Sequence, residues 1–101
     1  MAGGLQSLVV GNQNTASGTN STSVGYASSS SGTNSSAFGG LNSTTGANST
    51  AVGYANSSNG TDSTAIGNSN TANANQSTAV GYSSTANGVS SIAAGANSTA
   101  S

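Results

Sequence analysis

The chain lacks most of the side chains from which proteins build catalytic and metal-binding sites. Lys, Arg, His, Glu, Cys, Trp and Pro are all absent from its 101 residues, and Asp62 carries the only side-chain carboxylate. Without His, Cys or a second carboxylate, the chain offers no zinc site, no acid–base pair and no activated serine nucleophile. We therefore expect no enzymatic activity, no metal and no cofactor.

The same absences exclude two classes of partner. A chain without Lys or Arg has nothing that neutralises phosphates, so we expect no binding to nucleic acid. The longest apolar run near the start, Leu8 to Val10, is too short for the core of a signal peptide or for a membrane span. We therefore expect no insertion into a membrane.

What remains is a small set of neutral residues. Ser, Ala, Gly, Asn and Thr together account for 81 of the 101 residues, and the net charge is -1. A polar composition of such low complexity is typical of disordered chains. The order of the residues, however, is strongly periodic, and a fixed period is the signature of a repeat architecture.

Glycine and large apolar residues recur together at every fourteenth position. The first glycine column consists of Gly11, Gly25, Gly39, Gly53, Gly67, Gly81 and Gly95. The residues that immediately precede its first six members, here named the apolar column, are Val10, Val24, Phe38, Val52, Ile66 and Val80. A second glycine column follows at an offset of half a repeat, with Ala74 in one repeat and Gly18, Gly32, Gly46, Gly60 and Gly88 in the others.

Fourteen residues suit two short strands and two tight turns, in which glycine supplies positive φ angles. Stacked repeats bring equivalent residues together, and Asn, Ser and Thr can then form hydrogen-bonded ladders. Seven coils at the usual strand spacing give a rod about 34 Å long. The sequence thus predicts an all-β solenoid over residues 7–101 with a truncated last coil, preceded by a cap or docking segment at residues 1–6.

The segments 49–53, 63–67 and 77–81 read Ser-Thr-Ala-Val/Ile-Gly, which resembles the repeat of YadA-like heads of trimeric autotransporter adhesins. The resemblance implies a left-handed parallel β-roll that assembles as a homotrimer. Val, Ile, Leu, Phe and Met together are too few for a monomeric core in a chain of this length, which also favours a trimer. From the sequence, the apolar column faces either the coil interior or the trimer axis.

Repeats of this kind also resemble segments of bacteriophage fibre and virion surface proteins. The chain begins with Met1 and shows no signal peptide, stalk or anchor, which favours a complete short gene product. Our first interpretation is therefore a structural knob on a virion surface, either a capsid-decoration (cement) protein or a fibre head that contacts capsid or fibre proteins. The alternative is the head of a bacterial adhesin that binds host matrix from the cell surface.

Regular hydroxyl groups support ice binding as a minor alternative. The column at issue contains two residue types and consists of Thr15, Ser29, Ser43, Ser57, Thr71, Thr85 and Thr99. The mixture of Ser with Thr weakens this interpretation, because it makes the hydroxyl-bearing face less regular.

Two further features are candidates for contact with a partner. Tyr26, Tyr54 and Tyr82 directly follow the first glycine column in every second repeat, and we name them the tyrosine column. They either form an aromatic platform for a glycan or protein, or pack between protomers. The most apolar segment, with Met1, Leu5, Leu8, Val9 and Val10, either docks onto a larger assembly or caps the end of the roll.

Overall fold

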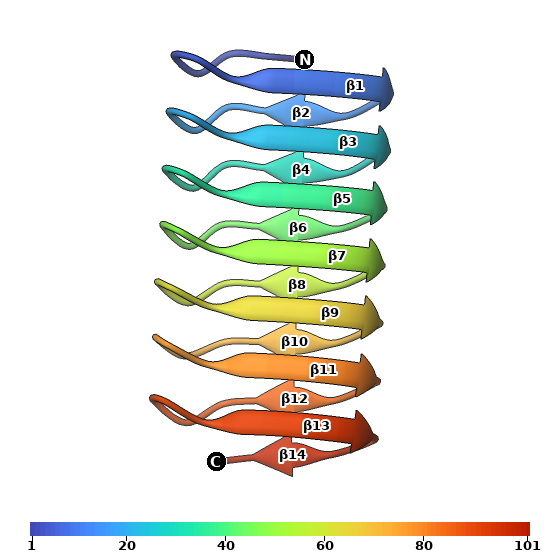
Figure 1. Ribbon diagram of the computed structural model, residues 1–101, viewed down its shortest axis with the longest axis vertical. Coiled ribbons are helices and arrows are strands. Elements are labelled where there is room, and N and C mark those ends of the chain that lie inside the picture. The colour runs from blue at the N-terminus through green and yellow to red at the C-terminus, as the bar shows by residue number, and fades with distance from the viewer.

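Each repeat folds into one coil, which contains a strand of five residues on one side and a strand of two residues on the other. A computed structural model describes the whole chain, residues 1–101. Seen along the rod from the N-terminus, the chain turns counter-clockwise as it recedes, so the coils are left-handed (Figure 1). The predicted all-β parallel solenoid of seven coils is confirmed.

The fourteen strands form two seven-stranded sheets (Figure 1). The long-strand sheet contains β1 (Leu8–Asn12), β3 (Thr22–Tyr26), β5 (Ser36–Gly40), β7 (Thr50–Tyr54), β9 (Thr64–Asn68), β11 (Thr78–Tyr82) and β13 (Ile92–Ala96). The short-strand sheet contains β2 (Thr15–Ala16), β4 (Ser29–Ser30), β6 (Ser43–Thr44), β8 (Ser57–Ser58), β10 (Thr71–Ala72), β12 (Thr85–Ala86) and β14 (Thr99–Ala100).

Equivalent residues of successive coils pair in parallel, so every column in the sequence becomes a column in space. Val52, for example, pairs with Phe38 on one side and with Ile66 on the other. The body measures 34 × 21 × 10 Å, and the length agrees with seven coils at the ordinary strand spacing. The period of the sequence is therefore the rise of the solenoid.

The coil interior holds only small side chains, because the two sheets lie so close together that the body is 10 Å thick. The buried hydrophobic residues are all alanines, among them Ala51, Ala65 and Ala79 on the long strands and Ala72 on a short one. Most other buried residues are serines. Along the long strands β3 to β11 the large apolar residue directly follows one of these small buried residues, and successive side chains point to opposite faces of a sheet, so the apolar column points out of the coil. This finding removes the coil interior from the two alternatives that the sequence left open.

A column of asparagine and serine residues, most of them buried, holds the corner that follows each long strand. We name it the asparagine column; its members are Asn14, Ser28, Asn42, Asn56, Asn70, Ser84 and Ser98. The Asn56 side-chain nitrogen donates to the carbonyl oxygens of Val52 (2.9 Å) and Gly67 (2.8 Å), and its oxygen accepts from the backbone N–H of Asn70 (3.0 Å). The column was missed by our reasoning from the sequence, although its signal, Asn or Ser at every fourteenth position, is plain.

The two glycine columns are required for different reasons. Residues of the first column have φ between 116° and 132°, and a Cβ on Gly53 would also overlap the carbonyl oxygen of Gly67 in the next coil. Glycines of the second column have no positive φ, so the predicted reason for them was wrong. They are small because a Cβ on Gly32, for example, would overlap the carbonyl oxygen of Gly46.

The left-handed backbone conformation is instead adopted by two columns of residues that carry side chains. One closes each repeat and contains mostly Asn, Asp and Gln, which tolerate this conformation. The other follows the tyrosine column and includes Ala27, Leu41 and Ala55, with φ of 53°, 56° and 58°. For such residues the conformation costs roughly 1–2 kcal/mol each.

Leu41→Asn is expected to stabilise the fold by about 1 kcal/mol, because asparagine relieves part of the strain at φ 56° and already occupies the equivalent position at Asn97. Leu41 is 45% exposed, so little apolar burial is lost. Thermal unfolding followed by circular dichroism at one fixed chain concentration measures the change. Leu5→Asn makes the same chemical change at an exposed residue without positive φ, and an equal gain in both variants would contradict the strain argument.

Candidate functional site

The structure offers surfaces rather than a cavity. It contains no pocket, and no three His, Cys, Asp or Glu residues lie together where they could hold a metal ion. No helix in the structure has the length and apolarity that crossing a membrane requires. The features that remain are the apolar column, the tyrosine column and the segment at the N-terminus.

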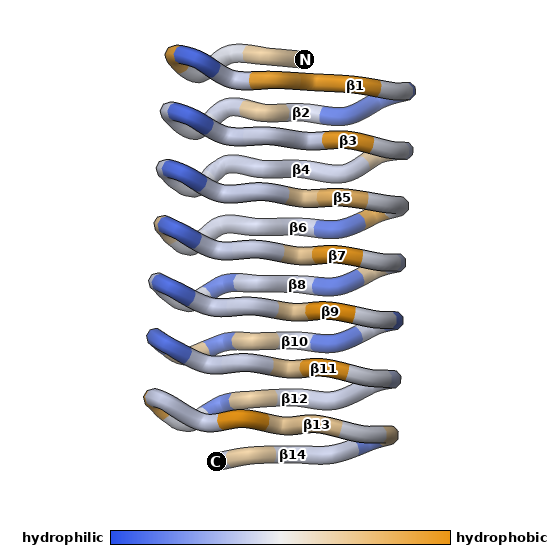
Figure 2. The backbone as a smooth tube through the Cα atoms, viewed as in Figure 1, coloured by the Kyte–Doolittle hydropathy of each residue, from blue (hydrophilic) through white to orange (hydrophobic).

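The apolar column lies along the outer face of the long-strand sheet. Figure 2 shows it as a line of hydrophobic segments that runs down the strands β3 to β11, with a broader apolar stretch on β1. Val10 is 50% exposed, Phe38 and Ile66 are each 38% exposed, and Val80 is 36% exposed, although these are among the largest apolar side chains of the chain. A contiguous apolar line of this length on one chain is typical of an interaction surface.

A second column on the same face flanks the apolar column two residues earlier in each long strand. It consists mainly of threonine and contains Leu8, Thr22, Ser36, Thr50, Thr64, Thr78 and Ile92. Side chains two residues apart in a strand lie on the same side of a sheet. The two columns together make a regular face without a single charged group, here named the long-strand face.

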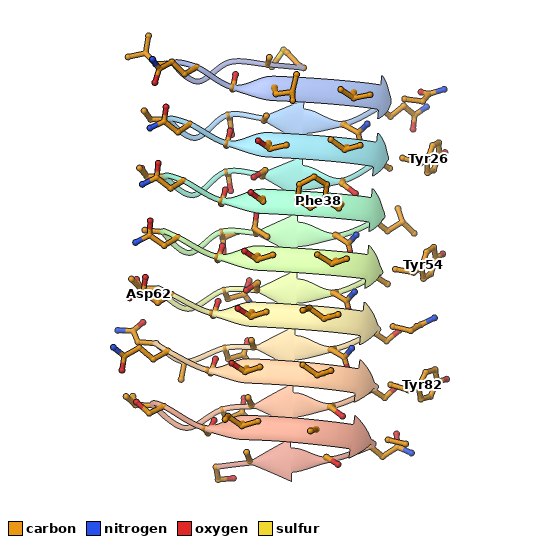
Figure 3. The ribbon with its side chains drawn as sticks, viewed as in Figure 1. Tyr26, Phe38, Tyr54, Asp62 and Tyr82 are labelled. Atoms are coloured by element: carbon orange, nitrogen blue, oxygen red, sulfur yellow. The ribbon has the colours of Figure 1, made fainter.

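The tyrosine column lies at the ends of alternate long strands. The side chains of Tyr26, Tyr54 and Tyr82 all project beyond the strand ends, away from the body of the rod (Figure 3). They are 53%, 52% and 57% exposed, so none is part of the core of the chain. The column therefore presents three aromatic rings on one edge of the rod.

The first residues of the chain form part of one more coil, which precedes the first complete coil. Ala2 forms a parallel bridge with Ala16, and the Leu5 carbonyl oxygen accepts from the N–H of Asn20 at 2.7 Å. The side chains of Met1 and Leu5 remain more than three-quarters exposed. The backbone thus covers the first coil, as a cap would, while the apolar side chains are free for a contact; both predicted roles remain open.

The column of Thr and Ser that suggested ice binding runs along the short strands. Thr15, Thr71 and Thr85 are each the first residue of a two-residue strand and are half-buried. Ice binding by this column stays a prediction.

The only carboxylate side chain takes part in a ladder of amides on the turns. The side-chain nitrogen of Asn20 donates to Asn34, that of Asn34 to Asn48, and that of Asn48 to a carboxylate oxygen of Asp62, at 3.0–3.2 Å. A single carboxylate among neutral amides has no second acid or base with which to share a proton. The ladder links four successive coils along one edge.

A family model described as the YadA head domain repeat (2 copies) matches residues 2–28, 30–56, 58–84 and 86–101. The starts of successive matches are separated by twice the period of the sequence, so each of the first three matches spans about two coils, and the last, shorter one covers the end of the chain. No curated protein is significantly similar to the chain. Because the four matches cover nearly every residue, and because the solenoid has the predicted coil and register, the chain belongs to the family of YadA head domain repeats.

Proposed function

We propose that this chain forms a head, or part of a head, of a homotrimeric adhesin on a bacterial surface, with no enzymatic activity. The observation that carries the proposal is the match to the YadA head domain repeat along four successive segments of the chain. From the sequence alone, the adhesin head was the alternative interpretation and the virion knob the first. The match favours it over the virion knob, and no comparison supports a capsid or fibre role.

The packing of the single chain supports self-association. Its buried hydrophobic residues are all alanines, which bury little apolar area each, whereas the large apolar residues are left partly in water. Three chains that bring their long-strand faces together around one axis would bury Val24, Val52 and Ile66 against their equivalents. The apolar column therefore acts as the shared core of the assembly rather than as the core of one coil.

The surface chemistry suits a passive, exposed role. A rod whose residues carry only one ionisable carboxylate and three phenols has little charge for salt to screen. Its contacts depend on apolar burial and on neutral hydrogen bonds, which persist over a wide range of ionic strength. Such a head keeps its shape outside the cell, where salt and pH vary.

Surface labelling of intact cells of the source organism tests the proposed location. Antibodies raised against the purified chain are expected to label the outside of unpermeabilised cells. Labelling confined to permeabilised cells would overturn the proposal. Labelling confined to released particles would also overturn it, and would favour the virion interpretation.

A further inference from the structure

The tyrosine column is the feature that the proposed assembly leaves without a role. Its three rings are half exposed and project from the edge of the rod rather than from the centre of the long-strand face (Figure 3). Successive members are two coils apart, because Tyr26 and Tyr54 both pair with Gly40, and Tyr54 and Tyr82 both pair with Asn68. Twice the strand spacing places the rings about 9.5 Å apart.

Backbone hydrogen bonds fix the position of each tyrosine's main chain along the rod. The carbonyl oxygens of Tyr26 and Tyr54 accept from the N–H groups of Leu41 and Ser69, both at 2.9 Å, and that of Tyr82 accepts from Asn97 at 2.8 Å. Gly40 also leaves space for the ring of Tyr54, since a Cβ there would lie 3.1 Å from the Tyr54 Cδ2 atom. Because the stacked backbone already sets the spacing of the three tyrosines, only the ring rotamers lose entropy when a ligand binds.

The surroundings of the rings are neutral, and on one side of Tyr54 they include an amide and a hydroxyl. Asn68 lies between Tyr54 and Tyr82, and its side-chain oxygen accepts from the Ser69 hydroxyl at 2.8 Å. This bond orients the amide and leaves its nitrogen free to donate. No cationic side chain exists anywhere in the chain to attract a sulfated or carboxylated polymer.

Aromatic rings with a neutral amide and a hydroxyl beside them match the chemistry of an uncharged sugar chain. Sugars present apolar C–H faces that stack on aromatic rings and hydroxyl edges that bind amides. In an extended β-linked chain, alternate sugars present the same face, so rings in alternate coils meet equivalent sugars. A narrow line of three rings is too small for a stable protein interface, which buries far more area.

We propose that the tyrosine column binds a neutral, extended β-linked polysaccharide that runs parallel to the rod. The inference rests on the proposed adhesive role and names a ligand class for it. The rings stack on every second sugar, and Asn68 donates to a hydroxyl between two of them. In a trimer, three such columns would strengthen binding to a surface through avidity.

Tyrosine fluorescence provides a direct measurement, because the chain has no tryptophan and all its emission comes from these three rings. The assembled chain is titrated with two extended β-1,4-linked probes, cellohexaose and chitohexaose, and with the curved α-1,4-linked maltohexaose. We expect saturable binding of at least one β-linked probe and none of maltohexaose. Tyr54→Asn is expected to weaken binding roughly 2- to 12-fold, as the loss of one aromatic contact does.

A swap variant tests the spacing with the composition held constant. Tyr54→Asn combined with Asn68→Tyr keeps three tyrosines, but places two of them in adjacent coils; both residue types already occur at this position. We expect the swap variant to bind no better than Tyr54→Asn alone, because it breaks the ring spacing and also removes the Asn68 donor. Equal binding by the swap variant and the natural chain would overturn the proposal, as would the absence of binding to both β-linked probes.

The oligomeric mass of each variant separates this inference from the proposed function. If replacing all three tyrosines with asparagine dissociates the assembly, the rings belong to the subunit interface and the glycan proposal is wrong. If the natural chain is assembled and displayed on cells but binds neither β-linked probe, only the glycan proposal fails. A monomeric chain absent from the cell surface contradicts the proposed function instead.

Discussion

Asn56→Ala is expected to lower the free energy of unfolding by about 3 kcal/mol or more, because it leaves buried polar groups without partners at about 1–3 kcal/mol each. The groups concerned are the carbonyl oxygens of Val52 and Gly67, which accept from Asn56, and the N–H of Asn70, which donates to it. Asn56 is 1% exposed, so water cannot replace these bonds without opening the coil. Small domains are only about 5–15 kcal/mol stable in general, so this is a large fraction.

The chain supplies its own matched control for this variant. Ser28 and Ser84 occupy the same column; the Ser28 hydroxyl donates to the Gly39 carbonyl oxygen at 3.2 Å and accepts from the Asn42 N–H at 3.3 Å. Asn56→Ser retains both functions and is expected to lose about 1 kcal/mol. Urea unfolding at one chain concentration measures both variants, and equal losses for Ala and Ser would show that the column does not act through these hydrogen bonds.

Val52→Asp is expected to convert the assembly into monomers at micromolar concentration. Val52 lies in the middle of the apolar column between Phe38 and Ile66, so a carboxylate there would be taken out of water in the proposed trimer. Three such carboxylates near one symmetry axis also repel one another. Because the side chain points out of the coil, circular dichroism should still report a β-rich chain if the single solenoid is stable.

Thr33→Asp adds the same charge on an exposed turn and serves as the control for Val52→Asp. This variant is expected to keep the mass of the natural assembly. Size-exclusion chromatography with light scattering distinguishes the two outcomes. An unchanged mass for Val52→Asp would show that the apolar column is not the subunit interface.

The architecture could be predicted because every coil has the same backbone conformation and therefore needs the same residue types at the same positions. Each residue pairs with the equivalent residue in the repeats before and after it. Glycine columns and repeated Ser-Thr-Ala-Val-Gly segments are therefore the pattern expected of stacked coils. The rod length followed from the coil count and the strand spacing alone. These are properties of the period, and the period is visible in one sequence.

The direction of the apolar column could not be predicted by the usual preference for large apolar residues inside. The coil is thin, and Ala51 and Ala65 lie between the sheets, so Val52 and Ile66, the next residues along their strands, face the opposite side. A sequence signal did exist: after Val9, the position before the apolar column holds only serine or alanine. In a narrow solenoid, a column that contains only small side chains indicates the interior better than a column of hydrophobic side chains does.

The corners were harder to predict because the left-handed conformation occurs at residues that disfavour it, such as leucine and alanine. Both glycine columns were expected to supply the positive φ angles of the turns, yet Leu41 and Ala55 adopt the left-handed conformation, and the second glycine column does not. Hydrogen bonds from these corner residues to the preceding coil, such as Leu41 N–H to the Tyr26 carbonyl oxygen, hold the conformation. Such bonds depend on the stacked neighbour, so the local sequence alone does not reveal them.

The mass of the natural chain in solution tests most directly the claim that its large apolar residues form a core shared between subunits. Light scattering over a dilution series at micromolar concentration, with circular dichroism on the same samples, is predicted to give a β-rich species of three times 9.4 kDa. A folded, β-rich species of 9.4 kDa that persists through the series would contradict the account.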